Sequence, residues 1–294
     1  KAFPGDHVKV VAAAEARRDE SSPHASWKEL LQHLDQAYEF DRVVYLSNYL
    51  TPHTDTVGEI ELLRSVFRTC AGRRVQLLYV AGPAGAEGAA DAAGRTGKGI
   101  IAHAANDLCR YYAAREGVQT KILRVPFLYT ASAALEDPFL APLFDACLTG
   151  SVALQGAQDA AFPLLCAEEL AVLERRIFDS WDGNFETLDV ADTFHHTVGE
   201  VGEALQALFP GVSVAYGDSA GYALPASDVA RVRYGWFQRY DLLLDLSTIQ
   251  ARWDAGRAKK VNPLRAAIDR IQMRTLPVKC LETAAAWVLF EVLE

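Results

Sequence analysis

Residues 41–81 read DRVVYLSNYLTPHTDTVGEIELLRSVFRTCAGRRVQLLYVA. Asp41–Ser47 and Val75–Ala81 are apolar runs of strand length, typical of strands that are buried on both faces of a parallel sheet. Between them, Thr56–Cys70 repeats its apolar residues at helical spacing, and Gly72 follows, as a glycine often does beyond a helix. The segment therefore predicts a strand–helix–strand unit with two parallel strands.

The same alternation extends to both sides of this unit. Downstream, Ile100–Arg115 predicts a helix and Thr120–Pro126, TKILRVP, a third buried strand. Upstream, His7–Ala13 predicts a strand and Ser26–Phe40 a helix with a plausible capping box at its start. We therefore expect an α/β fold, a Rossmann-like parallel sheet flanked by helices.

The second half of the chain predicts a smaller α/β lobe. Its expected elements are a helix and loop (Pro138–Gly156), a short strand and helix (Phe162–Trp181), a strand (Phe185–Val190), a helix (Phe194–Phe209), a strand (Val212–Tyr216), a helix (Leu242–Trp253), a linker (Ala255–Val261) and two amphipathic helices (Asn262–Met273 and Leu281–Leu293). We divide the chain into a core of residues 1–130 and 161–183, a substrate-type lobe of 131–160 and 184–254, and a C-terminal linker with helices at 255–294.

Composition excludes several classes of protein. Half of the 294 residues are apolar and 23% are charged, which is typical of a globular chain and not of a disordered one. The formal net charge of −9 gives no electrostatic footprint for nucleic acid or for an anionic membrane surface. No window reaches the ~18 uncharged apolar residues of a membrane span.

The cysteines and the two ends of the sequence indicate where the protein is located and whether it is part of a longer chain. The five cysteines lie far apart and form no C-x-x-C pair, which favours reduced, buried thiols in the cytoplasm over disulfides or a zinc site. The chain begins at Lys1 without Met and stops at Glu294 in an apolar, helix-like run, so we expect a domain of a longer protein. The last predicted helix, around Trp287, either packs on the domain or leads into membrane segments outside this sequence.

Several segments resemble the extended short-chain dehydrogenase/reductases, the family of NAD-dependent nucleotide-sugar epimerases and dehydratases. Ile122–Thr130, ILRVPFLYT, is similar to the family's I-L-R-P-x-N-V-Y-G strand and turn. Asp41–Ser47 is similar to its D-x-V-I-H-L-A strand, Val75–Gly82 to its fifth strand, and Arg233–Trp236, RYGW, to its C-terminal L-G-W motif. The resemblance covers about residues 7–253.

This resemblance implies a dinucleotide site at the carboxyl ends of the parallel strands. The residues expected to face a cofactor there are Ser47, Asn48, Ala81, Gly82 and Lys98. For Ser47 and Asn48, the alternative is that they only satisfy backbone groups at a turn. The resemblance also implies a tyrosine that moves a proton at the substrate hydroxyl, a lysine four residues later that lowers the tyrosine pKa, and a Ser or Thr at the end of the fifth strand.

The sequence departs from this catalytic pattern, because Tyr-x-x-x-Lys occurs nowhere in the 294 residues. Aligned on the lysine, Gly94 takes the tyrosine position and Lys98 the lysine position. If the alignment instead uses the distance from Arg124, Lys98 takes the tyrosine position and Ala102 the lysine position. The fifth strand ends without a hydroxyl, and residues 1–40 hold no glycine-rich phosphate turn, which leaves open whether the N-terminal part of the core is complete. We therefore assign no catalytic residue and expect no cofactor.

Two glycine-rich motifs are similar to phosphate-binding loops. Gly82-x-x-Gly85-x-x-Gly88 has the spacing of a phosphate turn, but more glycines follow before the helix is expected near Ile100, which favours a flexible loop. Gly94–Gly99, GRTGKG, lacks the Ser or Thr of a P-loop. Its Arg95 and Lys98 remain candidates for binding an anion, the alternative being solvated charges on a loop.

No metal site is predicted. His195 and His196 are adjacent, so on the predicted helix Phe194–Phe209 they point about 100° apart and cannot hold one metal together. The other histidines are scattered and form no H-x-x-x-H pair. We therefore interpret the two as histidines on a helix surface.

Three functions remain open. The favoured hypothesis is a non-catalytic, degenerate member of this family that serves as a dimerisation, interaction or regulatory module of a larger protein. The chain also resembles degenerate domains fused ahead of membrane and cyclic-dinucleotide-binding parts in exopolysaccharide-secretion proteins of the Pel type. The alternatives are an active NAD(P)-dependent nucleotide-sugar epimerase or dehydratase with an atypical acid–base group such as Lys98, and a sensor that binds a nucleotide sugar without turnover.

A homodimer is the expected assembly. The resemblance implies pairing through the two helices that flank the fifth strand, which here are residues 56–70 and 99–116. The alanines of the second helix, at positions 102, 104, 105 and 113, would permit a close approach of the helices.

Overall fold

The computed structural model describes residues 7–12, 40–47, 56–82, 97–132, 135, 137, 139–190, 193–218, 227–261 and 287–292. For 7–12, 97–99, 259–261 and 287–292 the description is limited to the backbone. The elements in chain order are β1 (His7–Ala12), β2 (Arg42–Leu46), α2 (Thr56–Cys70), β3 (Gln76–Ala81), α3 (Gly97–Arg115), β4 (Gln119–Arg124), β5 (Phe127–Tyr129), α4 (Leu140–Leu148), β6 (Ser151–Leu154), β7 (Leu164–Cys166), α5 (Ala167–Asp179), β8 (Phe185–Asp189), α6 (Val198–Leu208), β9 (Ser213–Tyr216), α7 (Val229–Tyr234), α8 (Leu242–Val261) and β10 (Trp287–Val292).

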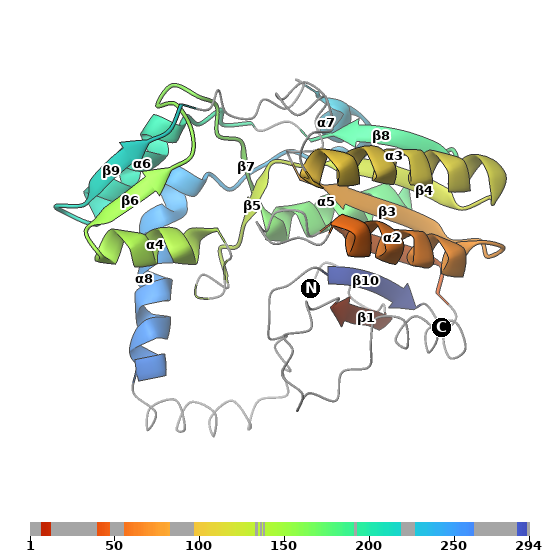
Figure 1. Cartoon of the computed structure of the whole chain (residues 1–294), viewed down its shortest axis with the longest axis horizontal. Helices are drawn as coiled ribbons and strands as arrows, with labels where there is room; N and C mark the ends of the chain where they lie inside the picture. Colours follow the sequence, from red (N-terminus) through yellow and green to blue (C-terminus); the bar gives the residue numbers. More distant parts are fainter. Residues whose placement is uncertain are drawn as a thin grey trace.

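A six-stranded sheet organises the larger part of the molecule, with strand order β1-β10-β2-β3-β4-β8 (Figure 1). β2, β3, β4 and β8 run parallel, as the three buried strands of the sequence predict. β10 is antiparallel to both of its neighbours, β1 and β2. The predicted α/β architecture, a mostly parallel sheet with helices on its faces, is confirmed.

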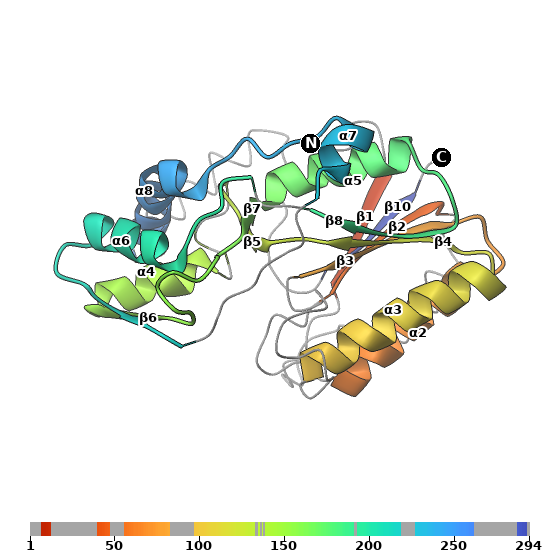
Figure 2. The same cartoon turned by 90° about the horizontal axis from the view of Figure 1, so that it is seen from above.

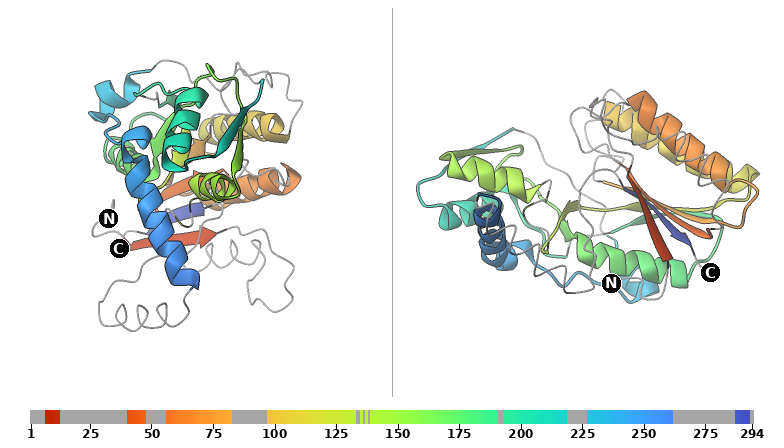
Figure 3. Two further views of the ribbon diagram at one scale, coloured as in Figure 1. Left: turned by 90° about the vertical axis from the view of Figure 1, so that its left-hand side faces the viewer. Right: turned by 90° about the horizontal axis from the view of Figure 1, so that it is seen from below.

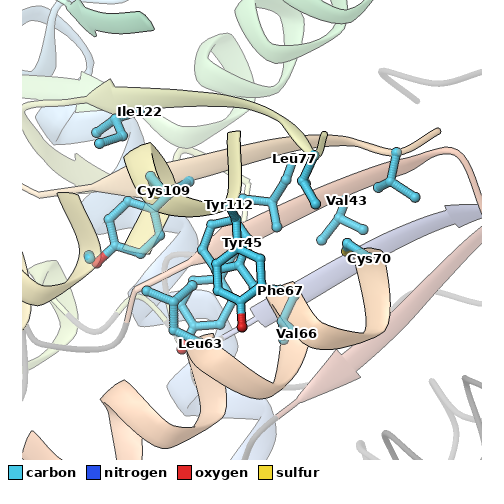
Figure 4. Packing of buried hydrophobic residues seen from close by; sticks show 14 of the residues in the cluster. Val43, Tyr45, Leu63, Val66, Phe67, Cys70, Leu77, Cys109, Tyr112 and Ile122 are labelled. Carbon is cyan, nitrogen blue, oxygen red and sulfur yellow. The ribbon is translucent and has the colours of Figure 1, made fainter. Parts of the chain in front are cut away.

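Helices α2 and α3 cover one face of this sheet, and α5 and α7 cover the other (Figure 2). Under α2 and α3, the apolar face predicted for residues 56–70 meets alternate residues of the strands. Figure 4 shows this cluster, which includes Val43, Tyr45, Leu63, Phe67, Leu77, Cys109 and Ile122. On the opposite face, the other alternate strand residues, among them Val44, Leu78 and Leu123, pack against α5 and α7. The helices contribute Leu173, Ile177 and Tyr234 to this cluster.

A small lobe, formed by α4, β6, α6, β9 and α8, lies beside the sheet (Figure 3). β6 and β9 form a parallel pair of their own. The second parallel pair, β5 and β7, joins the small lobe to the main sheet. Leu164 and Cys166 of β7 belong to the apolar cluster of the small lobe, whereas Leu165 between them belongs to the cluster under α5.

Two predictions about the C-terminal part are wrong. The sequence pattern predicts a helix over residues 281–293, but Trp287–Val292 is strand β10, because it bonds along two strands of the main sheet. The interpretation of this segment as a helix leading to a membrane loses its basis. The expected linker Ala255–Val261 is the continuation of helix α8, which runs unbroken from Leu242.

Three further boundaries differ from expectation. The range 184–254 is predicted to lie in the small lobe, but Phe185–Asp189 of this range is β8, which pairs with β4 as the edge strand of the main sheet. Residues 151–154, expected as a loop, form β6 because β9 pairs with them. Helix α6 begins at Val198 rather than at Phe194, because Thr197 and Glu200 form a capping box there.

The predicted helices Ser26–Phe40 and Asn262–Met273 lie outside the described residues, apart from Phe40 itself. α3 begins at Gly97, three positions earlier than the predicted Ile100. Of the helices that the structure describes, none combines the length and the hydropathy needed to cross a membrane.

Candidate functional site

The carboxyl ends of the parallel strands meet at one edge of the main sheet, which we call the carboxyl edge. It is formed by Ser47 after β2, Ala81 and Gly82 at the end of β3, Arg124 of β4 and Asp189 of β8. The register places Ala81 beside Arg124, and Arg124 beside Asp189. Ligands of open α/β sheets bind at this edge, so it is the candidate site.

Three of the five predicted residues lie together at this edge. The Ser47 amide donates a hydrogen bond of 3.2 Å to the Val80 carbonyl, which fixes the end of β2 beside β3 and Gly82. Asn48 lies outside the described residues. Lys98 lies in the first turn of α3, and its side chain is not described.

At the end of β2, the polar groups bond to one another. The Tyr45 hydroxyl donates to Glu59 Oε1 at 2.8 Å, and the Ser47 hydroxyl donates to the same oxygen at 3.2 Å. Burial raises the pKa of Tyr45 well above its ordinary value, and the Glu59 charge adds to the effect. Tyr45 therefore acts as a protonated hydrogen-bond donor and cannot serve as a base near neutral pH.

Among the described residues, the end of β3 carries no side-chain hydroxyl that could hold a substrate oxygen. Ala81 is buried in the apolar cluster beneath α2 and α3, and Gly82 follows it. A serine or threonine hydroxyl, which the resemblance implies at this position, is therefore replaced by an apolar side chain. The structure confirms the strand end that the sequence predicts and shows that its side chain is packed.

An ion pair lies across the ends of β4 and β8. Arg124 donates to both carboxylate oxygens of Asp189, from Nε at 2.6 Å and from Nη2 at 2.8 Å. Such a two-point contact is the strong geometry of an arginine–carboxylate pair. Sequence reasoning used Arg124 only to count positions and missed Asp189, although opposite charges ending neighbouring strands were the available signal.

One tyrosine and one lysine do approach each other from distant parts of the chain. Lys121, the lysine whose side chain the structure describes, lies near Tyr234 of α7, and its ammonium donates to Asp182 at 3.0 Å and to Glu186 at 2.7 Å. Burial raises the pKa of Tyr234 more than the Lys121 ammonium lowers it. Lys121 precedes Arg124 by three residues on β4, so this group lies away from the carboxyl edge.

The strand beside β2 also differs from that of a dinucleotide-binding sheet. In that architecture a parallel strand stands next to β2 and ends in a glycine-rich turn, which leads into a helix whose N-terminus binds the pyrophosphate. Here β10 occupies the place and runs antiparallel to β2, so its first residue, Trp287, lies toward the carboxyl edge.

The described residues of the carboxyl edge show no preformed site for the pyrophosphate of NAD. A pyrophosphate needs free backbone N–H groups and positive potential, whereas the Ser47 hydroxyl bonds to the carboxylate of Glu59, and Arg124 is neutralised by Asp189. The motif Gly82-x-x-Gly85-x-x-Gly88 lies outside the described residues after Gly82, as do residues 94–96 of the P-loop-like motif.

The prediction for the two histidines is wrong. Both precede α6 instead of lying on it, and His196 is buried, with its Nε2 at 2.7 Å from Asp241 Oδ1. Asp241 lies 45 residues away in sequence, so no local pattern could reveal the contact. Among the described residues, no group of three or more His, Cys, Asp or Glu side chains could hold a metal ion. Four cysteines, Cys70, Cys109, Cys147 and Cys166, are free and buried as predicted.

No protein-family model matches the sequence, and no curated protein matches it at significant similarity. Solved structures do resemble it. UDP-N-acetylglucosamine 4-epimerase from Bacillus cereus is 14% identical with a TM-score of 0.57, over 76% of this chain and 79% of that one. DesIV, a dTDP-glucose 4,6-dehydratase from Streptomyces venezuelae solved with NAD and TYD bound, is 12% identical with a TM-score of 0.59, over 78% and 76%.

A third similar structure is a GalE-like L-threonine dehydrogenase from Cupriavidus necator in its apo form. It is 17% identical with a TM-score of 0.56, over 77% of this chain and 87% of that one. At these identities the likeness concerns the fold. It spans both the main sheet and the small lobe, since each comparison covers about three quarters of the chain.

Proposed function

We propose that this chain, which has the fold of the extended short-chain dehydrogenase/reductases, is a non-catalytic domain that serves as a dimerisation, interaction or regulatory module of a larger protein. The observation that carries the proposal is the loss of the proton-transfer pair: Tyr-x-x-x-Lys occurs nowhere in the sequence. The packed Ala81 at the end of β3 and the neutralised Arg124 at the carboxyl edge support it.

The test of this proposal is turnover. The chain is mixed with NAD⁺ or NADPH and with a panel of UDP- and dTDP-sugars, and the absorbance of reduced nicotinamide and the sugar products are followed. We expect no conversion above the reaction without protein. Conversion that is lost in Lys98→Ala would overturn the proposal and support the alternative, an active enzyme that uses Lys98 as its acid–base group.

The alternative enzyme has one observation in its favour. A structure of the same fold, that of DesIV, contains NAD, so the fold itself is able to hold the cofactor. Under this alternative, NAD(P) is the cofactor and a nucleotide sugar is the substrate. A sensor without turnover would instead bind the nucleotide sugar in a calorimetric titration and leave it chemically unchanged.

We further propose that two copies of the chain pair through the outer faces of α2 and α3. The two helices lie side by side on one face of the sheet (Figure 2), and they expose Val57, Ile100 and Tyr111. Ala105 and Ala113 are both buried, so they cannot form the expected close helix contact. The apolar residues on the outer faces support the pairing in their place.

Pairing is checked by sedimentation at several protein concentrations. Tyr111→Glu is expected to convert a dimer into a monomer, because a charge replaces a 54% exposed aromatic ring at the interface. The matched control is Val232→Glu on α7, where the 71% exposed valine lies on the opposite side of the sheet. A wild-type chain that stays monomeric at high concentration contradicts the proposal.

The cellular location and the biological role of the domain form a separate proposal. We propose a cytoplasmic location, which the four free, buried cysteines support, and a role in exopolysaccharide biosynthesis of the Pel type, which rests on the resemblance stated from the sequence. Deleting the residues of this domain from the protein that contains it is expected to reduce exopolysaccharide secretion. Unchanged secretion would contradict the proposed role in exopolysaccharide biosynthesis. It would not affect the proposal that the domain is non-catalytic.

A further inference from the structure

Three stretches of chain run side by side where the polypeptide passes between the main sheet and the small lobe. We call them the crossing segments: residues 160–164 before β7, 193–197 after β8, and 235–241 between α7 and α8. The Phe162 amide donates to the His196 carbonyl at 2.8 Å, and the Thr193 amide donates to Gln238 Oε1 at 3.1 Å. Gln238 Nε2 donates in turn to the Leu164 carbonyl at 2.8 Å.

Buried polar side chains make the decisive contacts among these segments. Glu169, His196 and Gln238 are exposed by 6%, 9% and 4%, and each is hydrogen-bonded. With Asp241 they form what we call the clasp. Buried polar groups cost free energy unless their partners are present, so the four side chains specify one arrangement of the crossing segments.

The contact between His196 and Asp241 joins the starts of two helices of the small lobe. His196 directly precedes Thr197, the N-cap of α6, and Asp241 Oδ1 also accepts the amide of Leu243 in the first turn of α8 at 2.9 Å. The carboxylate of Glu200 lies 3.9 Å from the other ring nitrogen of His196. The His196–Asp241 contact is therefore a side-chain link between the start of α6 and the segment that leads into α8.

Glu169 extends this path to the main sheet. It lies on α5, and its carboxylate accepts the amides of Arg239 at 2.7 Å and Tyr240 at 3.1 Å. The Glu169 carbonyl also accepts the indole N–H of Trp236 at 3.1 Å. Polar contacts thus run without a break from α5, through residues 236–241, to His196 and α6.

Backbone strain is present at the same point. His195 has φ of 55°, in the left-handed region, and it is the non-glycine residue with positive φ among the described residues. Such a conformation persists where surrounding contacts hold it, and it is common at switch segments. The residue that follows is His196, whose side chain is held by Asp241 and whose carbonyl is held by Phe162.

We infer that the clasp is a latch that fixes the small lobe relative to the main sheet, with the His196–Asp241 contact as the releasable part and the β5–β7 pair as the pivot. Closed, the latch holds His195 in its strained conformation and keeps α6 and α8 aligned with α5. Open, it lets the small lobe turn about β5 and β7, whose residues pack into the clusters on both sides. This device is independent of whether the chain is catalytic.

The test measures the arrangement of the lobes in the full chain. Spin labels are placed at two exposed positions, Ala114 on α3 and Glu203 on α6, in a Cys280→Ser background, and the distribution of distances between them is recorded. His196→Phe removes the contact with Asp241 and keeps a ring that can stack on Phe194. The matched control is Asp228→Asn, which breaks the exposed Arg231–Asp228 ion pair of α7.

We expect His196→Phe to broaden the distance distribution or add a second population, and the control to leave it unchanged. Amide exchange at residues 193–197 and 236–241 is expected to quicken together, roughly tenfold, while β3 and β4 keep the wild-type rate. Asp241→Ala, which removes the oxygen shared by His196 Nε2 and the Leu243 amide, is expected to give the same result. An unchanged distribution in both variants, or faster exchange that includes β3 and β4, would overturn the inference.

Discussion

At the scale of single residues, Glu174 of α5 is a titratable group whose carboxyl lies in the interior of the folded chain. It is buried, and burial raises its pKa from 4.5 to about 8. The folded chain therefore binds a proton that the unfolded chain releases between these two values, so stability from this group is complete below pH 4.5 and is lost as the pH rises through about 8. Each pKa unit corresponds to about 1.4 kcal/mol.

Glu174→Gln removes this titration with little change in shape. We expect the variant to unfold with nearly the same free energy as the wild type at pH 5 and with a clearly higher one at pH 9, measured by urea denaturation at both values. The difference between variant and wild type isolates Glu174 from other titrating groups. If the free energies of unfolding of the two proteins change with pH in the same way, Glu174 does not bind the proton responsible for the pH dependence, and the prediction is wrong.

Lys121 lies near Tyr234 but donates to two carboxylates, and we expect both side chains to act in stability and not in proton transfer. Lys121→Met removes an ammonium bonded to two carboxylates, and we expect it to lower the unfolding free energy by about 2 kcal/mol. Tyr234→Phe removes a buried hydroxyl that has no hydrogen-bond partner among the described residues, so it is expected to change stability by less than ~0.5 kcal/mol. Thermal denaturation of both variants checks the pair, and a large loss in Tyr234→Phe would contradict this assignment.

At this scale, sequence reasoning located side chains but not their partners. It placed Ser47 at a strand end correctly, yet Glu59, which accepts its hydroxyl, escaped attention because the contact needs α2 to pack on β2. His196 was assigned to a helix surface for the same reason. Its partner Asp241 becomes a neighbour only when the crossing segments come together.

At the scale of elements, α6 shows how a few residues set a helix boundary. The Thr197 hydroxyl accepts the Glu200 amide at 3.2 Å, and Glu200 accepts the Thr197 amide at 2.8 Å. Thr197→Ala is expected to cost about 1 kcal/mol of stability. The control in the same helix is Gln206→Ala at an exposed position, where chemical denaturation is expected to show a change within ~0.5 kcal/mol. Equal losses in both variants would mean that the capping box contributes little.

The elements that the sequence predicted best are those with long periodic or strongly apolar patterns. Thr56–Cys70 is α2 with the predicted bounds, and the buried strands β2, β3 and β4 lie within one or two residues of expectation. The prediction of a helix at Trp287–Val292 is wrong because a short apolar run fits a helix or a strand equally well. The pairing of this segment with β1 and β2 makes it a strand. The prediction of a linker at Ala255–Val261 is wrong because the alanines and basic residues of this segment also favour a helix.

At the scale of the whole molecule, the fold is similar to that of known enzymes, whereas the side chains at the carboxyl edge of the main sheet differ from the catalytic pattern. The parallel strands, the covering helices and the small lobe are similar in fold to solved structures of a UDP-N-acetylglucosamine 4-epimerase, a dTDP-glucose 4,6-dehydratase and a GalE-like L-threonine dehydrogenase. At the carboxyl edge, the Ser47 hydroxyl after β2 bonds to Glu59 of α2, β3 ends in an apolar side chain, and Arg124 of β4 pairs with Asp189 of β8. Fold alone does not determine activity, so these side chains carry the functional argument.

The most direct measurement is a calorimetric titration of the chain with NAD⁺ and, separately, NADPH, at protein concentrations that resolve micromolar dissociation constants. A domain without a dinucleotide site gives only the heat of dilution for both cofactors, in the wild type and in Lys98→Ala alike. Saturable micromolar binding that weakens in Lys98→Ala would contradict the expected lack of a cofactor site and would favour the alternative, an NAD(P)-dependent enzyme.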